Sequence, residues 1–222
     1  MEENVSQMKA FADAIEELME KDSRIMVMTA DLVGSCALSH IEQEHGEHFV
    51  NVGIAEQNMI GIAAGMAREG LLPYAYTFAA FNSMRACEQI RTDVFYNDLN
   101  VKIVGTHCGM STGQAGSTHF ALEDIGIIRS MPKSVILVPA DPVSARKTAY
   151  LTYTYEGGAY IRLDRNPLEN IYEEDEVFEI GKGHVLREGT DIILYTIGAV
   201  AGDVLYAAEV IEKKTGKKDR GN

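Results

Sequence analysis

The sequence predicts an α/β fold: a doubly wound, mostly parallel sheet with helices on both faces, followed by the start of a second α/β unit. Short, nearly continuous apolar runs alternate with segments of helical periodicity along most of the chain. Strands that are apolar throughout are typical of a parallel sheet covered on both sides. Polar and aromatic residues follow the ends of these runs, where open α/β sheets bind their ligands.

The elements can be assigned in order along the chain. Apolar residues between Met8 and Met19 recur at helical spacing and predict the first helix. Six apolar runs are predicted strands, at 25–28, 49–52, 74–77, 101–104, 135–138 and 160–163. Further helices are predicted at 56–68, 82–96, 121–130 and 143–155. The last of these follows Asp141-Pro142, an N-cap residue with proline at the first helical position.

The chain is expected to contain two domains, residues 1–178 and residues 179–222. A linker at 181–189 is followed by a predicted strand at 191–195 and a predicted helix at 200–212. One strand and one helix cannot bury their own apolar faces. The second domain is therefore expected to be truncated or completed by another chain.

The composition limits the possible classes of function. The formal net charge of −13 disfavours nucleic-acid binding, because phosphates demand lysine and arginine. The sequence has no run of about 18 apolar residues that would span a membrane, and its acidic N-terminus does not resemble a secretory signal. The cysteines Cys36, Cys87 and Cys108 lack a metal-type spacing, so a reduced cytoplasmic setting and no metal ligands in this chain are expected.

Two further segments have unusual compositions. The loop 107–119 carries three glycines and five Ser, Thr or Gln residues between two histidines, without any charge, which suits a close approach of the backbone to a ligand. The helix 56–68 contains Gly61 and Gly65, each costing about 1 kcal/mol relative to alanine. Tight helix–helix packing is the usual compensation, so we expect a buried helix at a subunit contact.

Six stretches of the sequence resemble the transketolase family, specifically its pyrimidine-binding domain. They are TADLVGS (29–35), FVNVGIAEQNMIGIAAGMA (49–67), YTFAAF (76–81), THCGMSTGQAGSTH (106–119), EDIGIIRSMPKSVILVPAD (123–141) and YIRLDRN (160–166). They occur in the family's order and spacing, and GIAEQNM is highly specific. Residues 179–212 resemble the start of the family's C-terminal domain.

The resemblance implies a transferase subunit that binds the aminopyrimidine of thiamin diphosphate and moves a two-carbon ketol unit from a ketose to an aldose in carbohydrate metabolism. In the family, a Gly-Asp-Gly segment followed by Asn holds the diphosphate and Mg²⁺, and that signature is absent from this sequence. The resemblance therefore implies a split transketolase whose N-terminal, diphosphate-binding subunit is a separate chain. With a homodimer contact, a heterotetramer acting on sugars or sugar phosphates is expected.

Glu56 matches the family's cofactor-activating glutamate. The resemblance implies that its carboxyl hydrogen-bonds a pyrimidine nitrogen and favours the imino tautomer, which takes the proton from C2 of the thiazolium. Ile54, Met59 and Ile60 are expected to form an apolar shell that keeps this carboxyl protonated enough to donate.

The resemblance assigns roles to four further aromatic and histidine residues. Phe78 and Phe81 match aromatic residues that line the pyrimidine pocket, and Asp31 is a further expected cofactor-binding residue. His107 and His119 match histidines that face the substrate, where they bind its hydroxyls and move protons.

Substrate binding is expected to involve Ser35 and Arg165, which match residues that hold a distal phosphate. Three positions depart from the family pattern. Ala115 replaces an aspartate that reads the C2 hydroxyl, Met8 replaces a phosphate-binding arginine, and Met84 replaces a tyrosine that often closes the pyrimidine pocket. The usual sugar phosphates are therefore in doubt, whereas the chemistry that depends on Glu56 is not affected.

Two alternatives stay open from the residues alone. One is another enzyme of the superfamily, such as a deoxyxylulose phosphate synthase relative or the beta subunit of a 2-oxo acid dehydrogenase. The latter should lack the loop with two histidines. The other is a non-catalytic scaffold subunit of the same fold, which the intact Glu56 and aromatic positions disfavour.

Overall fold

The computed structural model describes residues 5–216 and 219–221, and its main body is a six-stranded parallel sheet with the strand order β2-β1-β3-β4-β6-β5. Every neighbouring pair of strands in this sheet is parallel. The predicted α/β class and all six predicted strands are confirmed. Their bounds are β1 Ile25–Thr29, β2 Phe49–Asn51, β3 Leu72–Phe78, β4 Lys102–Thr106, β5 Val135–Leu137 and β6 Ala159–Arg162.

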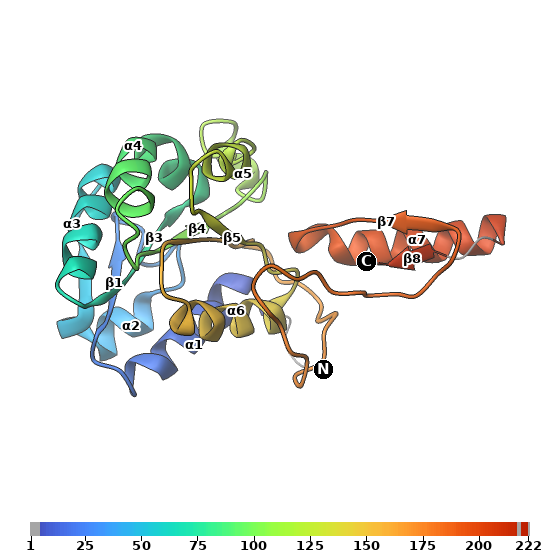
Figure 1. The fold of residues 1–222 in the computed structure, drawn as a ribbon, viewed down its shortest axis with the longest axis horizontal. Helices are drawn as coiled ribbons and strands as arrows, with labels where there is room; N and C mark the ends of the chain where they lie inside the picture. The colour runs from blue at the N-terminus through green and yellow to red at the C-terminus, as the bar shows by residue number, and fades with distance from the viewer. Residues whose placement is uncertain (1–4, 217–218, 222) are drawn as a thin grey trace.

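Helices cover both faces of the sheet (Figure 1). One face carries α1 (Gln7–Met19), α2 (Ser39–Glu44) and α6 (Pro142–Thr154), whose apolar residues share one buried cluster with β1 and β3. The other face carries α3 (Glu56–Arg68), α4 (Cys87–Gln89) and α5 (Asp124–Arg129) over a second cluster. The predicted cap of α6 is present: the carboxylate of Asp141 accepts the Ser144 N–H at 2.7 Å.

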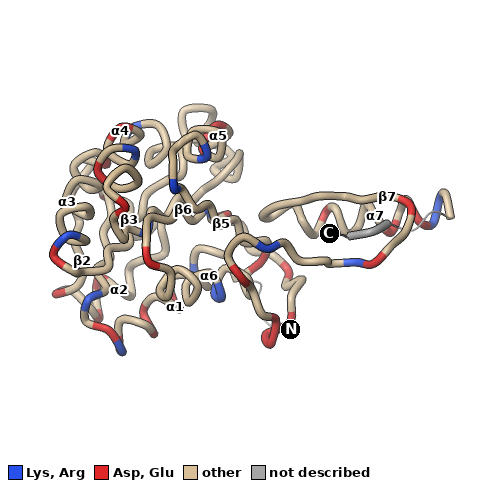
Figure 2. Tube along the Cα trace, in the orientation of Figure 1, with Lys and Arg blue, Asp and Glu red and all other residues tan. Residues whose placement is uncertain are grey.

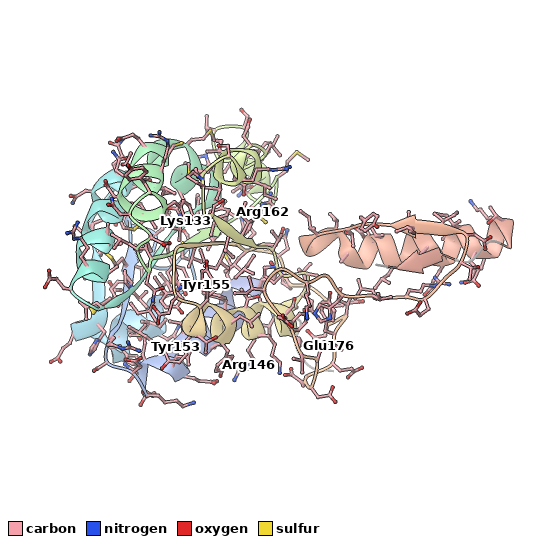
Figure 3. All side chains as sticks on the ribbon, viewed as in Figure 1. Lys133, Arg146, Tyr153, Tyr155, Arg162 and Glu176 are labelled. Atoms are coloured by element: carbon pink, nitrogen blue, oxygen red, sulfur yellow. The ribbon has the colours of Figure 1, made fainter. Side chains whose placement is uncertain are left out.

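Charged contacts add to the packing of α1 against α6. Arg146 of α6, labelled in Figure 3, donates to Glu17 of α1 at 2.7 Å, and the Tyr150 hydroxyl donates to the same carboxylate at 2.6 Å. The Arg146 guanidinium and the Tyr150 hydroxyl hold the pKa of Glu17 below its usual range. In the view of Figure 2, lysines and arginines lie on separate elements and do not gather on one face.

The helix predicted at 82–96 is a helical segment with two π-helical stretches, Phe81–Arg85 and Ile90–Phe95, on either side of α4. The wider π turn is rare and is found frequently at functional sites. Side chains of the first stretch tie it to the sheet, because Asn82 donates to the Val104 carbonyl at 3.0 Å. The first stretch follows β3 at the carboxyl edge of the sheet.

A smaller unit follows the six-stranded sheet and extends to one side of it (Figure 1). It consists of β7 (Ile192–Leu194), α7 (Ala201–Thr215) and β8 (Asp219–Gly221), with β7 and β8 paired in parallel. The predicted strand and helix are therefore present, and the domain boundary at residue 179 stays a prediction. Across the described residues, no helix is long and apolar enough to cross a membrane.

One helix was not predicted, and the expected burial of another is only partly present in the single chain. Helix α2 was not predicted, because among its six residues only Ile41 is buried and leaves no periodic signal. Helix α3 was expected to be a buried helix, yet Gly61 and Gly65 are exposed and an added Cβ at either would meet nothing within 4 Å. The buried face of α3 contains Met59, Ile60 and two alanines instead. A subunit contact on the glycine side stays a prediction.

Gly105 in β4 provides a test of this packing. A Cβ at this position would lie 2.5 Å from the buried Tyr160 Oη and 3.0 Å from the Ala79 backbone, so Gly105→Ala should lower the free energy of unfolding by about 1–3 kcal/mol. The matched control is Gly126→Ala in α5, where an added Cβ meets nothing and should add at most about 1 kcal/mol. Urea denaturation measures both, and an equal loss in the two variants would contradict the packing of β4.

Candidate active site

The residues predicted to form a site lie at or just after the ends of strands, at one edge of the sheet. Because the strands are parallel, their carboxyl ends meet there. Five strands contribute: Asp31 and Ser35 follow β1, Glu56 follows β2, Phe78 ends β3, His107 follows β4 and Arg165 follows β6.

Four of the predicted residues form an aromatic group. The ring centroids of Phe78 and Phe81 are 5.4 Å apart, and His107 lies on Phe78 at 4.1 Å. His119 approaches Phe78 at 6.0 Å and Phe81 at 5.2 Å. His107 therefore contacts Phe78, and His119, 12 positions further along the chain, contacts both phenylalanines. These distances suit offset or edge contacts between rings.

Glu56 is the first residue of α3 and its side chain is only 5% exposed. A carboxyl at a helix N-terminus is favoured by the helix dipole. Its oxygen Oε1 accepts a hydrogen bond from Nη1 of Arg85 at 2.6 Å. The expected apolar shell is only partly present, because Met59 and Ile60 are buried whereas Ile54 is 76% exposed.

Arg85 contacts two of the predicted site residues but was not itself predicted from the sequence. Its guanidinium carbon lies 3.6 Å from the centroid of the Phe81 ring, so one side chain contacts both Glu56 and Phe81. The available signal was its position four residues after Phe81, about one helical turn further on. No signal indicated Glu56, which lies 29 residues away in sequence.

His107 is held in a strained backbone conformation. Its φ of 55° lies in the left-handed region, which costs a non-glycine residue about 1–3 kcal/mol. Burial, the nearby Arg165 and His119 lower the pKa of His107 to about 4. The ring is therefore neutral near pH 7, with one nitrogen a donor and the other an acceptor. Its Nδ1 lies 3.1 Å from Thr106 Oγ1.

The base of the loop that carries both histidines is fixed by a buried ion pair. Gly109 and Ala121 exchange two backbone hydrogen bonds of 3.1 and 2.9 Å. Arg162 of β6, below α5 in the view of Figure 3, donates to the Ala121 carbonyl at 3.2 Å and to Asp124 at 2.7 Å. The Tyr160 hydroxyl donates to the same carboxylate at 3.0 Å. The loop is therefore anchored where it leaves and rejoins the sheet edge.

An open pocket of about 370 Å³ lies beside the aromatic group. Its lining includes three of the four residues predicted to bind substrate, and two of the three positions that depart from the family pattern. The lining residues are Met8, Gly34, Ser35, Phe78, His107, Thr112, Ala115 and Arg165. Asp31 is not among them; it is exposed, has a φ of 61°, and its N–H donates to Asn51.

The described part of the chain holds no cluster of three or more His, Cys, Asp or Glu residues that could bind a metal ion. Cys108, next to His107, is buried, and burial raises the pKa of its thiol to about 12. A neutral buried thiol is a poor nucleophile.

Comparison with known sequences identifies the family. The sequence profile of the transketolase pyrimidine-binding domain matches residues 3–170. A putative transketolase C-terminal section of Methanocaldococcus jannaschii is 40% identical over 207 residues, covering 92% of this chain and 66% of the relative. A 6-deoxy-6-sulfo-D-fructose transketolase subunit of a Clostridium species is 37% identical, with coverages of 90% and 62%. The chain thus spans just under two thirds of the length of these relatives.

Solved structures agree with this result. A split-gene transketolase described as an inactive beta4 tetramer matches with a TM-score of 0.89 at 36% identity, over 99% of this chain and 71% of that one. Transketolase from Campylobacter jejuni matches with a TM-score of 0.85 over 98% of this chain and 35% of that one, at 22% identity, which shows the fold alone. The chain therefore belongs to the transketolase family and carries its pyrimidine-binding domain.

Proposed function

We propose that this chain is the pyrimidine-binding subunit of a two-chain, thiamin diphosphate-dependent transketolase that transfers a two-carbon ketol unit from a ketose to an aldose. The observation that supports it most is the grouping of Glu56, two phenylalanines and two histidines at the carboxyl edge of the sheet. The diphosphate and its Mg²⁺ would be held by a partner subunit, and two copies of each chain would form a heterotetramer.

The residues of this edge fit an aminopyrimidine ring. Phe78 and Phe81 offer aromatic faces for a planar heterocycle. Glu56 sits beside them, and its buried carboxyl already accepts a hydrogen bond from a planar cation, Arg85. A protonated or hydrogen-bonded ring nitrogen would meet the same oxygen. No equivalent fit exists for the metal, for which the described residues offer no ligand cluster.

Bound thiamin diphosphate would supply an electron sink for breaking the carbon–carbon bond next to the ketose carbonyl. Glu56 would hold a proton at the pyrimidine nitrogen. His107, kept neutral by burial and by Arg165, would exchange protons with substrate oxygens near neutral pH. Arg165 and Ser35, which line the same pocket, would hold an anionic group at the far end of the substrate.

The isolated chain should bind thiamin diphosphate weakly. If a partner provides two or more charged hydrogen bonds to the diphosphate, at about 1.5–3 kcal/mol each, their loss weakens binding by at least about a hundredfold. Calorimetric titration with cofactor and Mg²⁺ compares this chain alone with its mixture with a subunit that carries Gly-Asp-Gly. Tight binding by this chain alone would contradict the division of the site between two chains.

Glu56→Gln should block activation of the cofactor in the assembled enzyme while leaving folding intact. The amide keeps the size of the side chain and can still accept from Arg85, but it cannot supply the proton. Exchange of the C2 proton, followed by NMR, should slow by about 10²–10⁴. Glu69→Gln, at the exposed C-terminal end of the same helix, is the matched control. A normal exchange rate in Glu56→Gln would remove this residue from the proposed mechanism.

Ala115 and Met8 should broaden substrate choice. A site that hydrogen-bonds a hydroxyl rejects substrates without it strongly, whereas an apolar site does not, so deoxy, shorter or non-phosphorylated sugars should serve nearly as well as sugar phosphates. Ala115→Asp with Met8→Arg should shift the ratio of kcat/KM values toward phosphorylated 2-hydroxy sugars, by about tenfold or more for one charged hydrogen bond.

Gln114→Asp is the control for Ala115→Asp. It adds the same charge at the neighbouring position, which does not line the pocket, and should leave the ratio unchanged. A thousandfold preference of the unmodified enzyme for phosphorylated 2-hydroxy sugars would contradict the role given to Ala115 and Met8.

A further inference from the structure

The side chain of Arg85 contacts both Glu56 and Phe81, the two residues proposed to bind the aminopyrimidine. The guanidinium of Arg85 donates from Nη1 to Glu56 Oε1 at 2.6 Å, and its central carbon lies 3.6 Å from the centroid of the Phe81 ring. That separation is the stacking distance of two planar groups. A pyrimidine ring cannot take the same face of Phe81 or the same oxygen of Glu56 while the guanidinium is there.

The chemistry of the guanidinium resembles that of its proposed replacement. Guanidinium is planar and presents a row of N–H donors along one edge. An aminopyrimidine is also planar, and when one of its ring nitrogens is protonated that nitrogen offers an N–H donor to a carboxylate. Arg85 therefore offers the same kind of stacking surface, and one N–H donor to Glu56, as the protonated ring for which Phe81 and Glu56 are proposed.

Arg85 is also the arginine of this edge that can leave. Its side chain is 46% exposed and its described polar partner is Glu56. Arg162, by contrast, is 16% exposed and donates both to Asp124, which is 1% exposed, and to the Ala121 carbonyl. Arg162 is thus fixed at the base of the loop. Arg85 is held by one hydrogen bond to Glu56, and nearly half of its side chain is exposed.

The buried carboxyl explains why an occupant is needed. Glu56 is 5% exposed, and a buried carboxylate without a partner is strongly destabilising. In the chain without cofactor, Arg85 supplies that partner. An aminopyrimidine that shares a proton with Glu56 at its ring nitrogen would donate to the same oxygen, and would replace Arg85 without leaving the carboxylate unpaired.

We propose, on the basis of the proposed function, that Arg85 is a gating residue of the pyrimidine site. It fills the site in the unloaded chain and has to leave the face of Phe81 and the oxygen of Glu56 before the aminopyrimidine can bind. The apparent affinity for the pyrimidine is then lowered by the fraction of chains in which the site is open. If the site is open in about one chain in ten, removing the guanidinium raises the affinity about tenfold.

The test uses the full 222-residue chain and the pyrimidine half of the cofactor alone, 4-amino-5-hydroxymethyl-2-methylpyrimidine. Ligand-observed NMR titration gives its Kd. Arg85→Gln should bind it about tenfold or more tightly than the unmodified chain. Arg85→Lys keeps a cation for Glu56 but has no planar group to stack, so it should bind with an intermediate Kd even if Arg85→Gln folds poorly. Arg91→Gln, an exposed arginine on the same helical segment, should leave the Kd unchanged.

Unchanged or weaker binding of the pyrimidine in both Arg85 variants overturns the proposal. An absence of binding in the unmodified chain and in every variant also overturns it. The variants Phe81→Ala and Glu56→Gln separate this outcome from failure of the proposed function. If the unmodified chain binds the pyrimidine and loses it in both of these variants, the site is correct and only the gate is wrong. If binding does not depend on Phe81 or Glu56, the pyrimidine site itself is assigned wrongly.

Discussion

The parallel direction of all six strands is the constraint on which the site depends. Because each strand points its carboxyl end to the same edge, segments far apart in sequence meet there. The register of β3 against β4 pairs Phe78 with Thr106, and the strained turn after Thr106 then brings the His107 ring to 4.1 Å from Phe78. A slip of one residue would turn Phe78 to the other face of the sheet. The geometry of the site therefore follows from strand register.

A second requirement acts within this frame: the buried carboxyl of Glu56 needs a donor. The N-terminus of α3 stabilises its charge, and Arg85 supplies a direct partner. The guanidinium of Arg85 also lies on the ring of Phe81, which contacts Phe78. A site of this kind selects a planar ligand with a hydrogen-bonding edge. Arg85 provides this donor in the chain without cofactor, and the proposed cofactor would provide it when bound.

The regular elements could be predicted because their burial patterns are local. Helix α3 runs over the predicted range, since its apolar residues recur at helical spacing, and the Asp141-Pro142 pair marks the start of α6. The positions of Phe78, His107 and Arg165 followed from the rule that sites lie beyond strand ends. The Glu56–Arg85 contact and the exposure of Ile54 could not be predicted, because they depend on how the π-helical turn after β3 passes the start of α3. The exposed glycines of α3 show the same limit.

The central claim is that this chain holds the pyrimidine half of thiamin diphosphate and leaves the diphosphate to another subunit. Saturation-transfer NMR on the chain alone, with the whole cofactor in excess, tests it most directly, because weak binding is sufficient for the measurement. The account predicts strong transfer from the protein to the methyl group and ring proton of the pyrimidine, and little to the methylene protons beside the diphosphate. Strong transfer to the diphosphate end, with little to the pyrimidine, would contradict it.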